Sequence, residues 1–303
     1  MFAKDRIERL EIDLTGSCNA RCPLCARNYK HLNVKYNERH LNEITAQLDE
    51  YENLEFVHLV GTVSEPTLYK HFFDLCHYLV KREIEIEICT NGDTHNPEWW
   101  ATLGGILSHR DKVYFSVCGS TQELHETYRV GCSLENLRKN AKALREACPH
   151  KVDYCQHIEF EYNKEDLKSE GMKEIFDEFS FINLTLTYFT RDKSIYKNQY
   201  NLDKLLPSDD FHNKYNLARD FAHKKWLTRD EKKCEMSCRS VFEKSVHINQ
   251  FGNVYPCYIW LEESHLPTWD GDYKKIENFE YECCKYCEKN TKKLLDSWGC
   301  ELL

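Results

Sequence analysis

Residues 9–25 read Arg9-Leu-Glu-Ile-Asp-Leu-Thr-Gly-Ser-Cys18-Asn-Ala-Arg-Cys22-Pro-Leu-Cys25. The first six residues alternate polar and apolar side chains, which is the period of a β-strand. Three cysteines follow with the spacing Cys-x3-Cys-x2-Cys. A short loop after a strand can wrap three thiolates around a cubane 4Fe–4S cluster, which leaves one iron free to bind a small molecule. The stretch therefore predicts a strand that leads directly into a cluster-binding loop.

A zinc loop is the alternative interpretation of these cysteines. Zinc knuckles usually combine one Cys-x2-Cys pair with a second, distant pair. Three cysteines within eight residues, at the start of a predicted barrel, fit that arrangement poorly.

The cysteine pattern resembles that of the radical S-adenosylmethionine (radical SAM) superfamily. The resemblance implies that Cys18, Cys22 and Cys25 hold a 4Fe–4S cluster whose open iron binds the amino and carboxylate groups of S-adenosylmethionine. It also implies reductive cleavage of S-adenosylmethionine to a 5′-deoxyadenosyl radical, which takes a hydrogen atom from an unactivated C–H bond of the substrate. In such an enzyme the cofactor carries the chemistry and the protein positions it.

Composition limits the possible classes of protein. The 303 residues are enough for one large domain and a small one, and a net charge of −9 argues against general binding of nucleic acid. We find neither a signal peptide nor a run of ~18 apolar residues, so we expect no membrane span. Sixteen cysteines in such a chain indicate metal clusters in a reducing compartment, and we expect a cytoplasmic protein.

Strand and helix patterns alternate over residues 7–190, which predicts a parallel sheet. The strand candidates are Ile7–Thr15, Leu54–Val60, Ile84–Cys89, Val113–Cys118, Val152–Tyr162 and Asn183–Tyr188. Apolar stripes predict helices over Thr67–Arg82 and Ser133–Cys148, the second with a good N-cap. Six strands are too few for a closed eight-stranded barrel. The resemblance implies a partial (β/α)6 TIM-like barrel with active residues at the C-terminal ends of its strands.

We expect three parts along the chain. Residues 1–190 form the barrel, and residues 191–233 form a linker with one amphipathic helix from about Ser208. Residues 234–303 form a small cysteine-rich domain of β-hairpin and helix.

The segment after the second predicted strand reads Gly61-Thr-Val-Ser-Glu65-Pro66. It is similar to the Gly-Gly-Glu-Pro element of the family, with one glycine of the pair. The resemblance implies that Glu65 contacts the amino group of S-adenosylmethionine and that Gly61 and Thr62 lie beside it. The alternative is an ordinary loop with a proline that starts a helix.

The next two strand ends also resemble cofactor-binding elements of the family. Residues 89–92 read Cys-Thr-Asn-Gly, similar to a Thr-Asn-Gly turn in which Asn91 bonds the loop and Gly92 takes a positive φ. Ser116 and, further on, Arg129 match positions that hold the ribose and carboxylate of S-adenosylmethionine. Cys118 stands where relatives have aspartate, and its phase with Ser116 makes it a candidate catalytic thiol.

Cysteine spacing dominates again after residue 234. The series Cys238-x13-Gly252-x4-Cys257 is similar to the start of the SPASM or "twitch" extension behind many radical SAM barrels, and residues 246–257 predict a hairpin with Gly252 in the turn. The resemblance implies one auxiliary 4Fe–4S cluster with the ligands Cys238, Cys257, Cys284 and Cys287. Three cysteines remain spare, and any of them can replace a ligand: Cys234, Cys283 and Cys300. A four-cysteine zinc site is the alternative.

Polar residues alternate along several predicted strands. The polar faces carry Glu11 and Asp13, then Glu85, Glu87, Cys89 and Asn91, then Cys155, His157, Glu159 and Glu161. Because helices cover the outside of such a sheet, we expect these faces to line the lumen. An acidic lumen would suit a cationic substrate, for example an amino-sugar-like small molecule. The alternative is that several of these carboxylates lie in water at the lower rim.

The resemblance leaves the reaction open. We expect a small-molecule or short-peptide substrate and a flavodoxin or ferredoxin-type electron donor. The chain starts its first strand within ten residues, so we expect no N-terminal peptide-recognition domain. A dehydrogenase would pass an electron to the auxiliary cluster, whereas an epimerase would quench the substrate radical with a thiol: Cys118, Cys89 or Cys155. A ribosomal peptide-modifying enzyme is a further alternative, and a non-catalytic iron–sulfur electron carrier or metal-sensing regulator is the alternative from another class.

Overall fold

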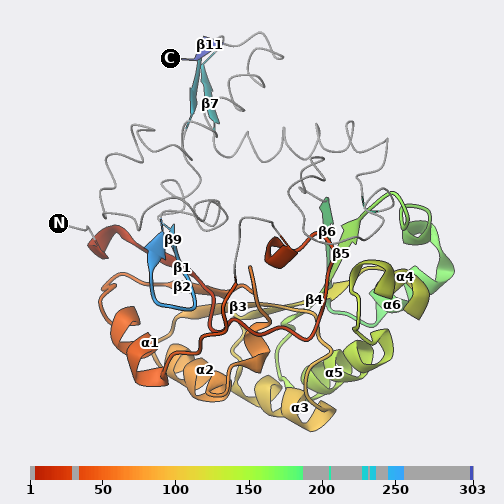
Figure 1. Ribbon diagram of the computed structural model, residues 1–303, viewed down its shortest axis with the longest axis horizontal. Helices are drawn as coiled ribbons and strands as arrows, with labels where there is room; N and C mark the ends of the chain where they lie inside the picture. The colour runs from red at the N-terminus through yellow and green to blue at the C-terminus, as the bar shows by residue number, and fades with distance from the viewer. Residues whose placement is uncertain are drawn as a thin grey trace.

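The computed structural model of the chain describes residues 4–28, 34–186, 205, 227–230, 233–236, 245–255 and 301–302. Six strands follow one another along its first part: β1 (Arg9–Ile12), β2 (Phe56–Leu59), β3 (Glu85–Thr90), β4 (Lys112–Val117), β5 (Asp153–Glu159) and β6 (Phe181–Leu186). Each strand pairs in parallel with the next, and together they form a curved sheet (Figure 1). The partial (β/α)6 barrel expected from the sequence is confirmed.

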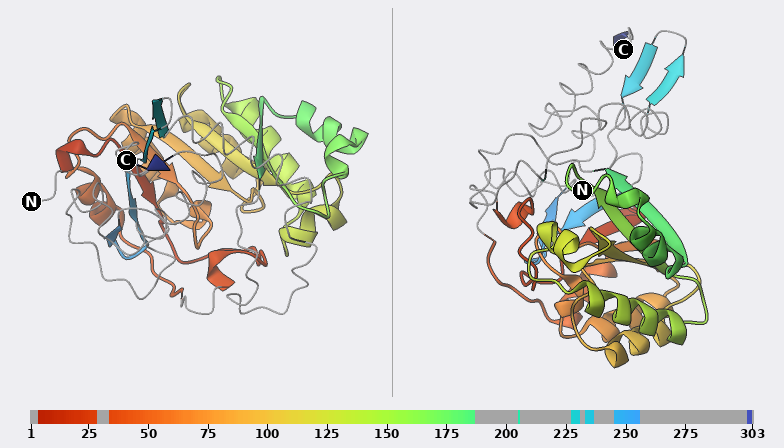
Figure 2. Two further views of the ribbon diagram at one scale, coloured as in Figure 1. Left: turned by 90° about the horizontal axis from the view of Figure 1, so that it is seen from above. Right: turned by 90° about the vertical axis from the view of Figure 1, so that its right-hand side faces the viewer.

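Helices connect the strands. They are α1 (Leu41–Leu48), α2 (Phe72–Lys81), α3 (Pro97–Ile106), α4 (Gln122–Tyr128), α5 (Leu134–Ala147) and α6 (Glu170–Asp177). Figure 1 and the right-hand view of Figure 2 show α1, α2, α3 and α5 on one side of the sheet, which leaves the other side for the lumen. Short 3-10 helices lie at η1 (Lys4–Arg6), η2 (Ala26–Asn28), η3 (Pro66–Leu68) and η4 (Asp166–Lys168).

Local sequence explains where the two expected helices begin and end. Ser133 caps α5 by accepting a hydrogen bond from the Asn136 backbone nitrogen at 3.2 Å, as expected. The helix expected over residues 67–82 is divided into η3 and α2, because Tyr69 has an extended backbone with ψ 124° and ends η3.

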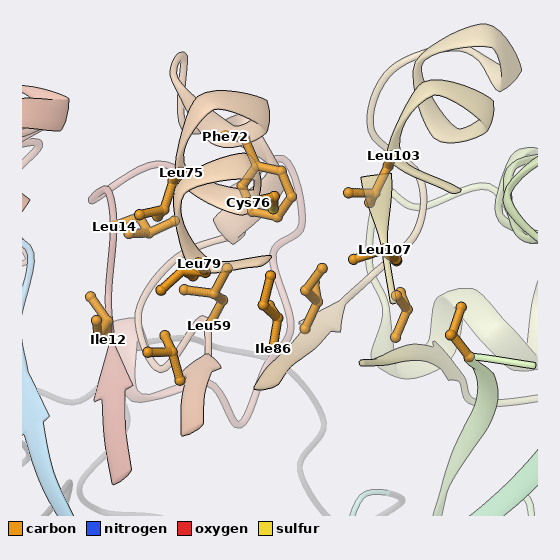
Figure 3. Packing of buried hydrophobic residues seen from close by; sticks show 14 of the residues in the cluster. Ile12, Leu14, Leu59, Phe72, Leu75, Cys76, Leu79, Ile86, Leu103 and Leu107 are labelled. Atoms are coloured by element: carbon orange, nitrogen blue, oxygen red, sulfur yellow. The ribbon is translucent and has the colours of Figure 1, made fainter. Parts of the chain in front are cut away.

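The main core lies between the sheet and these helices. Figure 3 shows Ile12, Leu59 and Ile86 from three strands packed against Leu75 and Leu79 of α2, and none of the five is more than 2% exposed. Each such side chain stabilises the fold by about 1.5–3 kcal/mol when it leaves water. Strand alternation then turns the residues between them toward the lumen.

A further parallel strand comes from the C-terminal part of the chain. Strand β9 (Ser245–Ile248) pairs with β1 over its full length, and β10 (Val254–Tyr255) returns antiparallel to β9. Gly252 lies in the turn between them with φ +82°, so the expected hairpin is confirmed. The complete strand order within the described residues is β10-β9-β1-β2-β3-β4-β5-β6. The range 234–303 thus contributes two strands to the barrel sheet.

A second small sheet within the described residues has the order β11-β8-β7, with β7 (Leu227–Asp230), β8 (Lys233–Met236) and β11 (Glu301–Leu302). Cys234 lies in β8. The helix expected from about Ser208 lies outside the described residues. Among the helices that the structure describes, none combines the length and apolar character that crossing a membrane requires.

The phase of β5 is opposite to the expectation. Gln156 lines the cavity described below, whereas Cys155 belongs to the main core. The ring of His157 lies 6.3 Å from the ring of Phe176 in α6. Strand alternation places Glu159 on the same helix-covered side, so the prediction that Cys155, His157 and Glu159 line the lumen is wrong.

Aromatic packing inside the barrel explains this phase. The ring of Tyr154 lies 4.7 Å from that of Tyr114 and 4.6 Å from that of Phe181, so the three form a cluster across adjacent strands. On the helix side, Oδ2 of the fully buried Asp153 carboxylate accepts hydrogen bonds from Arg145 at 3.3 Å and from the Ser180 backbone at 3.1 Å.

Candidate functional site

A cavity of about 560 Å³ opens where β1 to β5 end. Every barrel residue that the sequence assigned to the cluster or to S-adenosylmethionine lines it. These residues are Cys18, Cys22, Cys25, Gly61, Thr62, Glu65, Asn91, Ser116 and Arg129. The carboxyl ends of parallel strands meet at one edge of a sheet, which is why residues so distant in sequence converge here.

The cysteine loop is fixed by hydrogen bonds from its own backbone and from its neighbours. The Cys25 backbone nitrogen donates to the Cys22 carbonyl at 3.1 Å, and the Asn28 side chain donates to the same carbonyl at 2.8 Å. The Arg27 guanidinium donates to the carbonyls of Gly16 at 2.9 Å and Val63 at 2.7 Å. Arg27 therefore ties the cysteine loop to the loop after β2.

The three thiols do not form a compact site for a single ion. Ligand atoms around one zinc ion lie close together, yet Cys18, Cys22 and Cys25 do not form a group whose sulfurs all lie within 4.8 Å of one another. Burial raises the pKa of Cys18 to about 11 and that of Cys25 to about 12. These thiols would therefore ionise on binding a metal centre rather than before it.

Arg129 places a buried positive charge beside the cysteines. Its Nη1 lies 3.6 Å from the Cys22 sulfur, and the residue also contacts the Cys118 side chain. Burial acts to lower the pKa of Arg129, but the neighbouring sulfurs of Cys22 and Cys118 raise it well above its ordinary value. The guanidinium is thus held in place to balance negative charge on the cluster loop.

Glu65 joins the ends of β2 and β3. One carboxylate oxygen accepts hydrogen bonds from the hydroxyls of Thr90 at 2.7 Å and Thr67 at 2.8 Å, and the other accepts from the Asn91 backbone nitrogen at 2.8 Å. Burial raises the pKa of Glu65, against the opposing effect of these donors. Glu65 also caps η3, which begins at Pro66, so it contributes to the loop structure as well as to the cavity wall.

The turn after β3 has the expected geometry. Gly92 has φ +72°, and a side chain there would meet Leu137 and Phe115 at 2.8 Å, so only glycine fits. The Asn91 carbonyl oxygen of the side chain accepts from the Asp93 backbone at 3.0 Å. Its amide donates to Asn19 in the cysteine loop at 2.7 Å, which links a third strand end to the cluster loop.

Several lining residues were missed by the sequence analysis. Ser116, which was expected, lies 3.4 Å from Gln156 on β5, which was not. The sequence pattern did not identify Gln156 and Ile158 as cavity residues, because it placed them on the helix-covered face of β5. Arg21 and Arg27 lie within or next to the three-cysteine motif, and this proximity was the one available signal.

The three candidate thiols differ in their access to the cavity. Cys89 lines it. Cys118 is fully buried behind it among Cys22, Tyr128 and other side chains, and its carbonyl accepts from the Tyr162 hydroxyl at 2.9 Å. Cys155 faces the helices. Among these three, only Cys89 is placed to meet a substrate in the cavity.

Deeper in the lumen, a row of ionisable side chains crosses the inner face of the sheet. The strand register aligns one residue from each of five adjacent strands: His247, Glu11, His58, Glu87 and Lys112. Glu11 lies between the two imidazoles, 3.6 Å from Nδ1 of His247 and 4.0 Å from Nδ1 of His58. Acidic and basic groups thus alternate along this row, which contradicts the expectation of an acidic lumen.

Neighbouring side chains shift the pKa values of three residues in this row. Burial acts to lower the pKa of His58, but the Cys89 sulfur and the carboxylates of Glu11 and Glu87 raise it well above its ordinary value. Burial acts to lower the pKa of His247, but the hydrogen bond with Asp13 and the nearby carboxylate of Glu11 outweigh it and raise the pKa to about 9. Burial would raise the pKa of Glu11, but the two histidines hold it well below its usual range.

The expected C-terminal ligands lie outside the described residues. They are Cys238, Cys257, Cys284 and Cys287, and the spare cysteines Cys283 and Cys300 also lie outside. Glu161 follows β5 and pairs with Lys164 at 2.6 Å, so a positive charge lies beside this carboxylate.

Comparison with known proteins gives a family match over part of the chain. Residues 12–158 match the family model described as the radical SAM superfamily. A tungsten-containing aldehyde ferredoxin oxidoreductase cofactor-modifying protein of Pyrococcus furiosus is 26% identical over 148 residues, which cover 47% of this chain and 40% of that protein. This chain thus spans less than half of the length of that relative.

Two solved structures share the fold. Streptococcus suis SuiB bound to the precursor peptide SuiA matches with a TM-score of 0.59 and 15% identity, over 87% of this chain and 62% of SuiB. Native anSMEcpe with bound AdoMet and the Cp18Cys peptide matches with a TM-score of 0.57 and 17% identity, over 92% of this chain and 81% of that chain. At these identities the likeness shows the fold.

Proposed function

Residues 12–158 of this chain form a radical SAM domain, and from this premise we propose that the cavity binds a 4Fe–4S cluster and S-adenosylmethionine to abstract a hydrogen atom from a substrate. The convergence of Cys18, Cys22 and Cys25 with Glu65 and Arg129 on one cavity carries the proposal. An electron carrier or metal sensor, the alternative from another class, needs no such pocket beside its cluster.

The residues present fit these two groups. Three thiols without disulfide partners come from one short loop and line the same cavity. Arg129 supplies a buried positive charge at the Cys22 sulfur, where a cluster would add negative charge. The cavity of about 560 Å³ lies in the range of small-molecule sites, which typically enclose about 300–1,000 Å³.

In the proposed mechanism the chain holds and orients its ligands. The cluster and S-adenosylmethionine supply reductive cleavage and hydrogen-atom abstraction when bound. Cys18, Cys22 and Cys25 would ligate three irons, and Arg129 would stay charged and balance them. Glu65 would fix the strand ends that meet the amino group of S-adenosylmethionine.

Ser116 and Asn91 complete the proposed S-adenosylmethionine pocket, with the backbone of Gly61 and Thr62. Ser116 lines the wall beside Gln156, where its hydroxyl would meet a ribose. The Asn91 side chain donates a hydrogen bond to Asn19 in the cysteine loop, so it would hold the S-adenosylmethionine pocket in a fixed position relative to the cluster.

For the substrate we propose a short peptide, with a small molecule as the alternative. The SuiB and anSMEcpe structures that share this fold hold peptides, which supports the first class. The lumen supports neither a strongly cationic nor a strongly anionic substrate, because Glu11 and Glu87 alternate with His247, His58 and Lys112.

The decisive experiment counts iron and sulfide after anaerobic reconstitution. Wild type and the Cys18, Cys22, Cys25→Ala triple variant are compared. We expect about eight irons per chain to fall to about four, one cluster being lost and an auxiliary cluster at the C-terminal cysteines being kept. About four irons falling to none, with zinc present, would make the C-terminal site structural. An unchanged count would overturn the assignment of the three cysteines.

Production of 5′-deoxyadenosine under strong reductant tests the enzymatic function itself. The wild type should form it, and the triple variant should not. Intact clusters without any 5′-deoxyadenosine would favour an electron carrier or sensor instead. A low-potential donor such as flavodoxin or ferredoxin would supply the electron in the cell.

For the reaction type we propose a dehydrogenation in which the auxiliary cluster accepts the second electron. An epimerase is the alternative, and its thiol would be Cys89 because that side chain lines the cavity. Turnover in deuterated water separates the two: carbon-bound deuterium in the product indicates an epimerase, and a product lighter by two hydrogens indicates a dehydrogenase. Loss of deuterium incorporation in Cys89→Ala would identify the thiol.

A further inference from the structure

His58, Glu87 and Cys89 bring three different donor atoms together on the inner face of the sheet. The His58 Nε2 lies 3.2 Å from the Cys89 sulfur and 3.5 Å from Oε1 of Glu87. All three ligand atoms lie within 4.8 Å of one another, the one such group of His, Cys, Asp and Glu among the described residues. The roles proposed for the cavity mouth do not use His58 or Glu87.

The sheet itself creates this arrangement. Parallel register places His58 on β2 directly opposite Glu87 on β3. Cys89 lies two residues further along β3, so it points to the same face and one side-chain layer closer to the cavity mouth. The three side chains are partly buried, which leaves them accessible from the lumen.

The two separations from Nε2 of His58 are close to those around a single metal ion. Zinc binds imidazole nitrogen and carboxylate oxygen at about 2.0–2.2 Å and thiolate sulfur at about 2.3 Å. A tetrahedral ion with those bonds separates nitrogen from sulfur by about 3.6 Å and nitrogen from oxygen by about 3.4 Å. The observed separations of 3.2 Å and 3.5 Å need side-chain shifts of only tenths of an ångström.

Glu11 occupies the position of an outer partner to this site. Its carboxylate lies 4.0 Å from Nδ1 of His58, the ring nitrogen that points away from Cys89 and Glu87. Metal-binding histidines usually turn their second nitrogen toward a carboxylate, which fixes the ring orientation. His247 holds Glu11 from the other side at 3.6 Å.

We propose that His58, Glu87 and Cys89 bind one Zn²⁺ ion through Nε2, a carboxylate oxygen and the thiolate. Three protein ligands leave a fourth position, which is the arrangement of an open rather than a structural zinc site. Since Cys89 lines the cavity, that position faces the space where a substrate would lie. A carboxylate or thiolate of the substrate, or water, would occupy it.

Zinc binding here does not depend on radical chemistry, so the two proposals fail separately. Binding requires His58 to be neutral and Cys89 to be ionised, and it therefore releases the protons that these side chains carry. The hydrogen-bonded pair of His58 and Cys89 is the metal-free alternative, and a zinc count distinguishes them.

The test uses the full chain with its iron–sulfur clusters assembled, so that the cluster cysteines are occupied. Wild type, His58→Gln, Glu87→Gln and Cys89→Ser are dialysed against Zn²⁺, and zinc and iron per chain are measured in the same samples. We expect each variant to retain about one zinc fewer than wild type. Glu11→Gln should keep the site but weaken its affinity by about 10- to 100-fold, as loss of an outer partner does.

Matched controls separate this site from nonspecific binding. Glu85→Gln removes a carboxylate from the same face of β3, and Cys148→Ser removes a thiol at the end of α5; neither should change the zinc count. X-ray absorption of the extra zinc should show one sulfur at about 2.3 Å among nitrogen and oxygen ligands, whereas a C-terminal four-cysteine site would show four sulfurs.

Equal zinc in wild type and Cys89→Ser, at unchanged iron, would overturn the proposal. Cys89→Asp covers the case in which the serine variant does not fold, because aspartate restores a ligand. That variant should regain the zinc without the sulfur signal, and its failure to do so while folded would also count against the site.

Discussion

At the scale of single residues, Arg129 gives the sharpest prediction. Its guanidinium is buried and lies 3.6 Å from the Cys22 sulfur. A nearby positive charge favours the reduced, more negative cluster, and charge and hydrogen bonds at the sulfurs set cluster potentials. We expect Arg129→Met to shift the potential of the barrel cluster to more negative values, as measured by redox titration followed by electron paramagnetic resonance.

Arg138→Met is the control for this change. Arg138 pairs with Glu178 on the outer face of the protein, and its loss should leave the potential where it is. If a cluster-replete Arg129→Met protein kept the wild-type potential, Arg129 would have a structural role alone.

Residue-scale prediction from sequence worked where a motif is contiguous. Glu65 lies in the loop after β2 and Asn91 directly follows β3, so a short pattern was enough to assign both to the cavity. Gln156 has no such pattern, because its position depends on the phase of a strand whose two faces are equally mixed in polarity. What sequence could not supply was the second role of Glu65, whose oxygens are already bonded to Thr67, Thr90 and Asn91.

At the scale of elements, α3 and α5 approach one another at Gly104. A side chain there would come within 2.5 Å of the Leu144 carbonyl, whereas one at neighbouring Gly105 would meet nothing within 4 Å. We expect Gly104→Ala to destabilise the protein by about 1–3 kcal/mol through overpacking. Gly105→Ala should stabilise it by about 0.5–1 kcal/mol, because alanine is the better helix former. Urea unfolding of the two single variants measures both changes.

These two glycines are each other's control, since they differ in environment and share one helix. Equal effects of both substitutions would mean that α3 and α5 are not packed as described. A stabilised Gly104→Ala protein would mean the same.

The contact between β9 and β1 predicts a pH dependence of stability. His247 is fully buried, with Nε2 3.1 Å from Asp13, and its pKa is raised from 6.5 to about 9. Because the folded pKa exceeds the unfolded one, the stabilisation is complete below pH about 6.5 and is lost as pH rises through about 9. A difference of this size corresponds to about 3 kcal/mol.

The measurement compares the free energy of unfolding of wild type and His247→Gln across this pH range. Wild type should lose stability on going from pH 6.5 to pH 9, and the variant should lose less by about the amount given by the pKa difference. The pH dependence of His58 is present in both proteins and cancels in the difference. Identical curves would show that His247 does not carry the effect.

Strand order along the chain was predictable, but strand faces were only partly so. On β3 the sequence alternation gave the right phase, since Ile86 and Ile88 are core residues and Cys89 lines the cavity. On β5 it gave the wrong phase, because Tyr154 stacks inside the barrel and Asp153 is buried outside against Arg145. A polar side chain can be buried on the helix-covered face when a nearby residue bonds it. Polarity alone therefore does not tell which face of a strand points into the lumen.

At the scale of the whole molecule, the sheet is completed by a strand from far along the chain. The sequence predicted six parallel strands from local patterns. It could not predict that β9 pairs with β1, because such a pairing depends on the closure of a long loop rather than on local propensity. The pairing covers the β1 edge, since Val246 and Ile248 are each only 1% exposed.

The pairing predicts that the barrel needs β9 to fold. Burial of Val246 and Ile248 stabilises the sheet by about 3–6 kcal/mol together, a large part of the about 5–15 kcal/mol that is typical of a whole protein. A chain that ends at residue 190 leaves Leu10 and Ile12 beside an open edge, and an open apolar edge is prone to aggregation. We therefore expect a chain of residues 1–190 to aggregate and one of residues 1–257 to stay soluble with a cooperative thermal transition. The soluble yield and the thermal melting of the two chains, followed by circular dichroism, test this prediction. Equal melting temperatures would mean that the six-stranded barrel is stable alone and does not need β9 to fold.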